Sequence, residues 1–581
     1  MRSLRDRLRT TAPTTDASVI AKDAVTAWNS LYTLGVGVVG AVDGRGIVYP
    51  DRRELLVEVW FGVGERWLRG GSADGVRQRR VDGLPIIETR QRAGEKDLVQ
   101  TAWADESGNG TGRINLALVN ETDDAVIAAI VVRPFATLTD GSIGKIRCVD
   151  SVIVADRRPV VDIGRTPGDC ATAEDSHRAS PAVLDALSLA TGQRAQSWEM
   201  VDPHGRASLA AMIPLTPGID RVVQIVDGRE QASVAPAPLD AVQRGWSQHL
   251  REAAEIDLPT WPAHIFPSLT SSLLGAVEQQ HRPLGDRSWS PADDALLVCA
   301  LGAIGLGDSG LSTTADLLAG VTTGAIERDR WADVAGAIAA MVGTGEAERV
   351  FARESDALIA VVGHVLSRLS AHSVATPLIE AVAMSNGPGP AQDASQIVAK
   401  SVDPAIEHTL LRHGWLGPNE APALTDRPTS AEQVAIEMIA SVQRFKPSEP
   451  LMDLRAKAGS SWRWSRGANG DSPHVRAQLA IALATWCRRI GSADATPTID
   501  LIPGMRASWY GQSLGFNRLP TAGSRLSVAL RWHGARPALL WEFDGAIPDG
   551  YRITCASLDR TFSSVESSGE HLLEAPLEVQ R

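Results

Sequence analysis

The amino-acid sequence predicts a multidomain β + α protein with three folded parts. These are an N-terminal β-sandwich at residues 31–235, a central α/α toroid of helical hairpins at 263–495, and a small C-terminal β-domain at 496–581. Apolar residues recur with period 2 in the first and last parts, between frequent turn formers, and with period 3.6 in the middle part. The remaining residues are expected to form an N-terminal arm or helix at 1–30 and a linker helix at 236–262.

The composition of the chain argues against a nucleic-acid-binding, a membrane-spanning or a secreted protein. The chain has 581 residues, 44% of them hydrophobic, and a formal net charge of −12, so a nucleic-acid backbone is repelled on average. The apolar run at 34–42 is too short to span a bilayer, and no apolar segment of a secretory signal follows the basic start. We therefore expect a cytoplasmic protein without a nucleic-acid or membrane partner. The oligomeric state stays open.

The N-terminal part contains short apolar or alternating runs separated by pairs such as Asp43-Gly44 and Asp82-Gly83. Short strands with regular turn punctuation are typical of a β-sandwich or barrel. The clearest runs are 55–60, 84–87, 98–102, 114–118 and 126–132.

The segment Gly35-Val-Gly-Val-Val-Gly40 matches the dinucleotide-binding pattern GxGxxG. That motif requires a strand before it and a helix after it, whose N-terminus receives the pyrophosphate. Here Asp43-Gly44-Arg45-Gly46 interrupts the chain, so a glycine-rich hairpin is expected and no cofactor is predicted. The cysteines are dispersed and include no CxxC, and the histidines are scattered, which argues against a disulfide framework and against a metal site.

The middle part contains helices of two kinds. Ser290-Pro291 begins a helix whose residues 296–304 leave almost no polar face, and 356–369 is also apolar nearly all round, whereas 331–342 is apolar on one face. Buried helices that alternate with amphipathic ones suit an inner ring inside an outer ring. Roughly ten or eleven helices of ordinary length fit between 262 and 492, close to the number in a toroid.

The C-terminal part opens on a predicted hairpin. Leu526 to Trp532 alternates apolar and polar residues, 533–537 supplies a turn, and 538–543 returns as an apolar run.

This hairpin, RWHG followed by RPALLWE, is preceded by LPT, by Pro503-Gly504 and by Trp509-Tyr510-Gly511. Together with Gly245-Trp246 and the I-x-L-P step at 256–259, it resembles bacterial proteins of the six-hairpin glycosidase-like superfamily, which includes glucoamylases. The resemblance implies a supersandwich-like N-terminal domain, a toroid of six helical hairpins and a carbohydrate ligand. The paired catalytic glutamates of glucoamylases are not found, so an inactive member of the group is an alternative.

Inverting glycoside hydrolysis needs two carboxyl groups about 6.5–9.5 Å apart. In a toroid they should lie on loops at the mouth of the inner ring. We predict Asp471 and Asp286 as the catalytic pair, against the alternative that each caps a helix. The loop-borne acids considered are Asp286, Asp308, Asp403, Glu420, Glu449 and Asp471.

Substrate-binding residues are predicted around the same two acids, because tryptophan faces stack on sugar rings, although most tryptophans pack in cores. They are Trp462, Trp464, Arg466, His474 and Trp289. The predicted function is that of a glycoside hydrolase-like protein acting on an oligosaccharide or glycoside by general acid–base chemistry. The alternatives are a catalytically inactive carbohydrate-binding or scaffolding protein, and a phosphorylase in which Arg466 and His474 bind phosphate.

Overall fold

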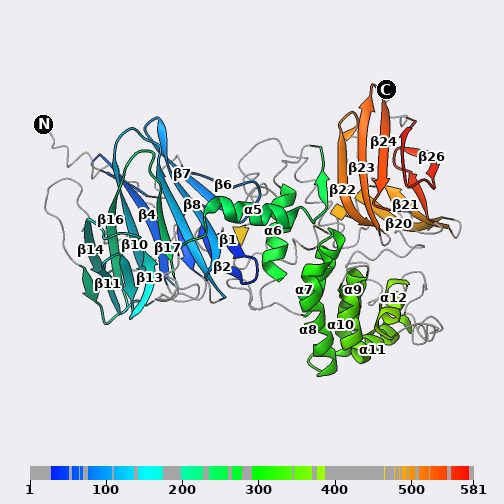
Figure 1. Cartoon of the computed structure of the whole chain (residues 1–581), viewed down its shortest axis with the longest axis horizontal. Coiled ribbons are helices and arrows are strands. Elements are labelled where there is room, and N and C mark those ends of the chain that lie inside the picture. Colours follow the sequence, from blue (N-terminus) through cyan, green and yellow to red (C-terminus); the bar gives the residue numbers. More distant parts are fainter. Residues whose placement is uncertain are drawn as a thin grey trace. The chain divides into compact units, whose positions relative to one another are not determined.

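In the computed structural model (Figure 1) the chain divides into two compact units. The first comprises 1–245, 278–286 and 460–470, and the second comprises 246–277, 287–459 and 471–581. The residues that the structure describes are 28–50, 55–64, 66–69, 76–107, 110–135, 142–174, 198–226, 235–259, 265–277, 291–342, 346–368, 376–386, 463–464, 477, 480, 483–484, 487–493, 496–503, 505, 509–521, 524–545 and 551–574.

The first unit contains two extended β-sheets, named sheet A and sheet B. Across sheet A the strands are β14 (Asp169–Glu174), β16 (Ala207–Leu215), β10 (Val126–Pro134), β4 (Leu55–Val63), β3 (Val48–Pro50), β2 (Gly37–Asp43), β1 (Trp28–Thr33) and β19 (Arg463–Trp464), with β5 (Arg66–Leu68) also paired to β4. Across sheet B they are β15 (Glu199–Val201), β11 (Lys145–Val149), β12 (Val152–Ala155), β13 (Arg158–Asp162), β17 (Arg221–Ile225), β9 (Thr111–Asn120), β8 (Lys96–Ser107), β7 (Ile87–Ala93) and β6 (Val76–Arg80).

Alternating side chains of both sheets form one hydrophobic core, as in a β-sandwich. From β4 the core receives Val57 and Val59, and from β9 it receives Leu116 and Leu118. The sandwich prediction is confirmed. Four of the five predicted runs lie in strands β4, β8, β9 and β10.

The fifth run, 84–87, is mostly a turn. Leu84 N donates to Val81 O and Val81 N donates to Ile86 O, so the chain reverses before β7 begins at Ile87. Leu84 and Ile86 are buried all the same, because the turn folds them inward. The unbroken apolar run at 84–87 predicted a strand, but most of these residues are buried in a turn.

The GxGxxG segment forms the hairpin of β1 and β2, with a turn at 34–36, as predicted. A strand, not a helix, contains Gly40. A Cβ atom at Gly40 would lie 2.6 Å from Cδ1 of Ile114 and 2.7 Å from the main-chain oxygen of Tyr49. The glycine therefore allows β2 to approach its neighbours closely.

Replacing Gly40 by alanine is expected to lower the free energy of unfolding of the sandwich by about 1–3 kcal/mol, because backbone and core side chains must both shift. Gly245→Ala is the matched control, since a Cβ there meets nothing within 4 Å and the residue lies inside a helix. It should be neutral or stabilising by about 0.5–1 kcal/mol. Urea titration followed by circular dichroism measures both, and an equal response of the two variants would contradict the packing role.

A proline-rich connector lies against the outer face of sheet B. Buried Asp105 accepts from Arg113 Nη2 (2.6 Å) and Nε (2.9 Å), and its Oδ2 also accepts from Ala237 N at 2.7 Å. Arg113 Nη2 donates to Ala235 O at 3.2 Å, and Trp103 Nε1 donates to Ala237 O at 3.3 Å. The buried ion pair thus fastens the connector to the sheet.

The connector leads into α5 (Leu239–Leu250), which carries the buried Trp246, and then into β18 (Glu255–Asp257). The boundary between the two units falls within α5, after Gly245. The helices of the second unit that the structure describes are α6 (Ile265–Val277), α7 (Pro291–Ala303), η1 (Gly307–Gly310), α8 (Leu311–Thr322), η2 (Arg328–Arg330), α9 (Trp331–Met341), α10 (Ala347–Arg353), α11 (Ser355–Leu366) and α12 (Thr376–Asn386).

Burial confirms one helix prediction and corrects two. α7 begins at Pro291, and Leu296 to Leu301 are buried without exception, as expected. In α9 every residue from Ala332 to Ala339 is buried as well, because α7, α8, α11 and α12 all contact it. α11 was expected to be buried nearly all round, yet Ile359 is 39% exposed. Closure into a toroid would involve residues outside those described, so the toroid stays a prediction.

The C-terminal part of the second unit contains two sheets. One has the order β18, β22 (Leu514–Thr521), β23 (Ser524–His533), β24 (Arg536–Phe543) and β27 (Ser568–Leu572). The other has the order β20 (Arg488–Ala493), β21 (Thr496–Leu501), β25 (Arg552–Cys555) and β26 (Asp559–Ser564).

The predicted C-terminal hairpin is confirmed as β23 and β24, with a shorter turn than expected. His533 pairs with Arg536, so Gly534-Ala535 alone forms the turn, and Gly534 has φ +64. Pro537 was assigned to the turn but lies in β24, opposite Trp532. Two-residue hairpin turns require positive φ, which glycine adopts without strain.

The segment around β18 is joined to this hairpin. Ile256 pairs with Phe516 of β22. Arg525 of β23 donates to Glu252 O at 2.8 Å and to Gly305 O at 3.2 Å. Ala254 N also donates to Ile304 O at 2.7 Å, just after α7. Main-chain and arginine hydrogen bonds therefore connect β18, the end of α7 and the hairpin within one unit.

Candidate functional site

Most of the residues predicted to bind or cleave a sugar lie outside the described residues. Asp308 is described, and it is an exposed residue of η1. Trp464 belongs to β19, for which the structure describes the backbone. Those outside are Asp286, Trp289, Asp403, Glu420, Glu449, Trp462, Arg466, Asp471 and His474.

The backbone of Trp464 lies in the first unit, as part of sheet A. In β19, Trp464 pairs with Trp28 and Arg463 pairs with Asn29. On its other side Trp28 pairs with Asp43 of β2. A segment more than four hundred residues away in the sequence thus supplies a strand beside β1, which no local pattern in the sequence could indicate.

A buried charged cluster lies on the outer face of the same sheet. Val57 and Val59 face the core, so the intervening Glu58, and Trp60 beyond, face away from it, yet Glu58 is 5% exposed and Trp60 0%. Glu58 Oε1 accepts from Arg133 Nη1 of β10 at 2.7 Å, and Oε2 accepts from Trp60 Nε1 at 2.8 Å. The guanidinium of Arg69 lies 5.4 Å from the centre of the Trp60 ring, a cation–π contact.

The charges around Glu58 decide its protonation. Burial acts to raise the pKa of its carboxyl, but the Arg133 and Arg69 guanidinium groups and the hydrogen bond from Trp60 outweigh burial, so the pKa lies below its ordinary value. Glu58 is therefore ionised at neutral pH. Both of its oxygens already accept hydrogen bonds.

Asp43 is the second buried carboxyl of sheet A. Its Oδ1 accepts from the main-chain N of Arg45 (2.9 Å) and of Ile47 (3.0 Å), while Oδ2 accepts from Arg45 Nε (2.9 Å) and Tyr49 Oη (3.3 Å). Burial raises the pKa of Asp43 despite the Arg45 charge.

Two carboxyls whose pKa values move in opposite directions are typical of acid–base pairs. Here each carboxyl has both oxygens engaged. Asp43 stabilises the turn between β2 and β3, and Glu58 links β4 to β10. We therefore assign both to the structure of the sandwich.

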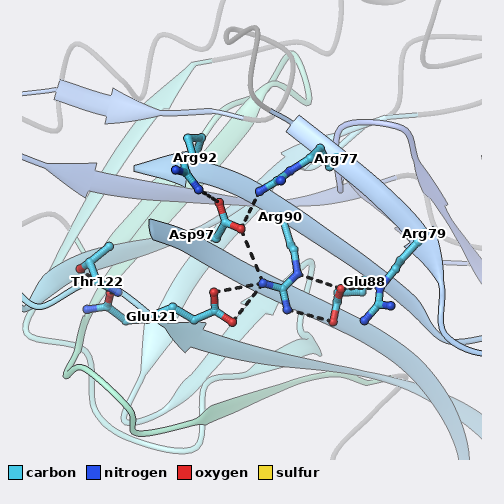
Figure 2. A network of polar contacts seen from close by, with 9 residues as sticks. Arg77, Arg79, Glu88, Arg90, Arg92, Asp97, Glu121 and Thr122 are labelled. Carbon is cyan, nitrogen blue, oxygen red and sulfur yellow. Dashed lines mark hydrogen bonds and ion pairs between the residues drawn. The ribbon is translucent and has the colours of Figure 1, made fainter. Parts of the chain in front are cut away.

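An ion-pair network covers the outer face of β6, β7 and β8 (Figure 2). Arg90 is central: Nε lies 2.9 Å from Glu88, and Nη1 lies 3.0 Å from Glu121 and 3.5 Å from Asp97. Arg79 and Arg77 add further pairs to Glu88 (2.7 Å) and Asp97 (2.6 Å). Cross-strand pairs of opposite charge stabilise neighbouring strands. Charged side chains on an edge strand such as β6 also disfavour its pairing with a strand of another molecule.

This network should contribute little to stability. Arg90 is 31% and Arg79 62% exposed at the side chain, and exposed ion pairs are worth about 0–1 kcal/mol each. Arg90→Gln is expected to lower the free energy of unfolding by about 1 kcal/mol at low ionic strength, and Arg79→Gln by less. Urea titration with and without added salt should show both effects shrinking as salt screens the charges. A salt-independent loss would contradict the ion-pair explanation.

Within the described residues no group of three or more His, Cys, Asp or Glu side chains is arranged to hold a metal ion. None of the described helices is long and apolar enough to cross a membrane.

No protein-family model and no curated protein sequence matches the chain. Among solved structures it is similar to a family GH92 α-mannosidase from Bacteroides thetaiotaomicron, with 11% identity and a TM-score of 0.28 over 64% of this chain and 53% of that chain. It is also similar to a protein from the human microbiome described as a kojibiose phosphorylase, with 7% identity and a TM-score of 0.34 over 97% and 98% of the two chains. The chain spans about half the length of the α-mannosidase. At these TM-scores the likeness carries no argument about activity.

Proposed function

We propose that this chain is a carbohydrate-active protein that acts on an oligosaccharide or glycoside by general acid–base hydrolysis. One observation supports the proposal. The two stretches that carry the resemblance to six-hairpin glycosidases, 245–259 and 501–543, lie far apart in the sequence. They meet in one sheet, where Ile256 of β18 pairs with Phe516 of β22. The two stretches therefore belong to one structural assembly, which supports reading them together.

In the proposed mechanism Asp471 and Asp286 are the carboxyl pair. One, protonated, donates to the departing glycosidic oxygen, and the other removes a proton from the attacking water. Trp462, Trp464 and Trp289 stack on sugar rings, and Arg466 and His474 hydrogen-bond to hydroxyl groups. No cofactor takes part in this chemistry.

The test uses the full chain with a panel of aryl glycosides and unlabelled oligosaccharides, each with and without inorganic phosphate. Hydrolysis of at least one substrate is expected without phosphate. Asp471→Asn and Asp286→Asn should each lower kcat by about 10²–10⁴-fold, the usual contribution of a general acid or base. Asp316→Asn is the matched control, because Asp316 is an exposed acid of α8 that is not among the acids considered for the site, and it should leave kcat unchanged.

Other outcomes separate the alternatives. Turnover that requires phosphate would replace hydrolysis with phosphorolysis. Sugar binding in calorimetry without turnover of any substrate would indicate an inactive carbohydrate-binding protein. If the chain shows no binding and no turnover of any sugar in the panel, the proposal is overturned.

A further inference from the structure

The short strand β19 depends on β1 for its position. It contains only Arg463 and Trp464, whereas strands in globular proteins usually have about 3–10 residues. β19 lies at the end of sheet A beside β1, where Trp464 pairs with Trp28 and Arg463 pairs with Asn29. Two residues do not hold an extended conformation by themselves, so whatever fixes β1 also fixes the backbone of β19.

β1 is held against sheet B by a chain of hydrogen bonds. Leu31 packs in the core between the sheets, and Asn29, two residues earlier on the same face, is fully buried. Asn29 Nδ2 donates to Oε1 of Gln78 in β6 at 2.6 Å. Gln78 Nε2 in turn donates to Asp43 O at the end of β2 (2.7 Å) and to Thr89 Oγ1 of β7 (3.0 Å). One glutamine of sheet B therefore ties down both strands of the β1–β2 hairpin.

These contacts set the position of β1 more than they stabilise the fold. Apolar contacts are non-directional, whereas a hydrogen bond requires its donor and acceptor to be aligned. Asn29 Oδ1 is buried with no hydrogen-bond partner among the described residues, and such an oxygen carries a desolvation cost. An apolar residue at position 29 would avoid that cost but would lose the bond to Gln78. The asparagine therefore favours the placement of β1 over stability.

We propose that Asn29 and Gln78 are positioning residues for the carbohydrate site: they hold β1, and β1 holds the segment that carries the predicted sugar-binding residues Trp462 and Trp464. This inference rests on the proposed function. The pairing matters because a slip of one residue between β1 and β19 would turn Trp464 to the opposite face of sheet A. Asp471, the predicted catalytic acid, follows Trp464 by seven residues, so β19 also limits its Cα atom to within about 25 Å.

The first experiment measures the anchoring of β19 and needs no sugar. In the full chain, Trp28→Cys and Trp464→Cys place two thiols at directly opposite positions. In an antiparallel pair the Cα atoms of such positions lie about 4.5–5.5 Å apart, a separation that a disulfide spans. With oxidised glutathione as the oxidant, peptide mapping by mass spectrometry should find a bridge between positions 28 and 464. Adding Gln78→Leu should slow its formation by about 2–10-fold, the effect of one lost hydrogen bond on an equilibrium.

Gln100→Leu is the matched control for Gln78→Leu. Gln100 is a buried glutamine of β8 in sheet B, and its Nε2 donates to the main-chain oxygen of Gly46 at 2.8 Å. Among the described residues it makes no hydrogen bond to β1, so Gln100→Leu should leave the rate of bridging unchanged. Asn29→Leu removes the same bond as Gln78→Leu and serves as the second variant. Equal rates in all backgrounds, or no bridge between positions 28 and 464, would overturn the proposal.

The second experiment separates this inference from the proposed function. Calorimetry measures the affinity of the wild type, Gln78→Leu and Gln100→Leu for the panel sugar that the wild type binds most tightly, after circular dichroism has shown that each is folded. Gln78→Leu should weaken the affinity by about 2–10-fold, because only molecules with β19 in place bind well. Gln100→Leu should leave the affinity unchanged.

The outcomes of the second experiment point to different failures. Equal affinity of the wild type and Gln78→Leu would overturn the positioning role and leave the proposed function intact. A wild-type chain that binds no sugar in the panel would overturn the proposed function and this inference with it.

Discussion

Replacing Arg133 by methionine is expected to lower the free energy of unfolding of the sandwich by about 3–5 kcal/mol, because the change removes the guanidinium that is hydrogen-bonded to the buried Glu58 carboxylate. The side chains of Arg133 and Glu58 are 5% and 6% exposed, so solvent screens their interaction little. Urea titration followed by tryptophan fluorescence, which reports on buried Trp60 among others, measures the change. Arg244→Met is the matched control, because Arg244 and its partner Asp240 are 71% and 66% exposed; it should change the free energy of unfolding far less, since exposed ion pairs contribute little.

The same ion pair predicts a pH dependence. The folded pKa of Glu58 lies below the ordinary value of about 4.3. The unfolded chain therefore takes up a proton first as pH falls, and the stability from this group is present above about pH 4.3 and lost as pH falls through the folded pKa. In Arg133→Met this acid-side loss should shrink, because Arg133 no longer lowers the pKa of Glu58 while Arg69 and the hydrogen bond from Trp60 remain. An identical acid profile in wild type and variant would show that Glu58 is not held ionised by Arg133.

Asp105→Asn is expected to release the connector at 235–238 and to lower the free energy of unfolding by about 3 kcal/mol or more, since Arg113 is left buried with its carboxylate partner removed. Asp105 and Arg113 are 4% and 1% exposed at the side chain. The asparagine also presents an amide group where Ala237 N now finds a carboxylate oxygen. Limited proteolysis should cut the variant near the connector many times faster than the wild type.

The control for this variant makes the same chemical change in the loop between β9 and β10, at an acid that pairs with strand β8 of the same sheet. Asp123 pairs with Lys96 of β8 at 2.5 Å and is 84% exposed, so Asp123→Asn should alter unfolding by less than about 1 kcal/mol and leave the cleavage rate unchanged. If Asp105→Asn behaves like Asp123→Asn, the buried pair does not hold the connector.

Hydrophobic periodicity predicted most strands and helices, but it did not predict which faces of α9 and α11 are covered by neighbours. It predicted the hairpin of β23 and β24, whereas the glycine-rich hairpin of β1 and β2 was predicted from the turn formers that follow Gly40. It failed for α9, whose alanines and Gly336 resemble a polar face in a helical projection, although neighbouring helices pack on all sides. Small residues permit that close packing but carry little hydrophobic signal.

The charged residues of the sandwich show the same limit. Glu58, Arg113 and Arg133 occupy alternate strand positions that indicate a solvated face, yet all three are buried. The connector, which covers the region of Arg113, lies 122 residues further along the chain at Ala235. A local pattern contains no information about such distant cover. For the candidate sugar site, the sequence supplied residue types and a resemblance, but not the distance between two carboxyls on which hydrolysis depends.

The pairing of β18 with β22 sets a condition on how the C-terminal region can be produced. Glu255–Asp257 is synthesised long before Leu514–Thr521, and the five-stranded sheet is incomplete until the two meet. A fragment that starts after residue 260 would expose the backbone N–H and C=O groups of β22 on one side, which invites pairing with a second molecule. A soluble fragment of the C-terminal region therefore has to retain β18, the short strand that precedes the helices in the sequence.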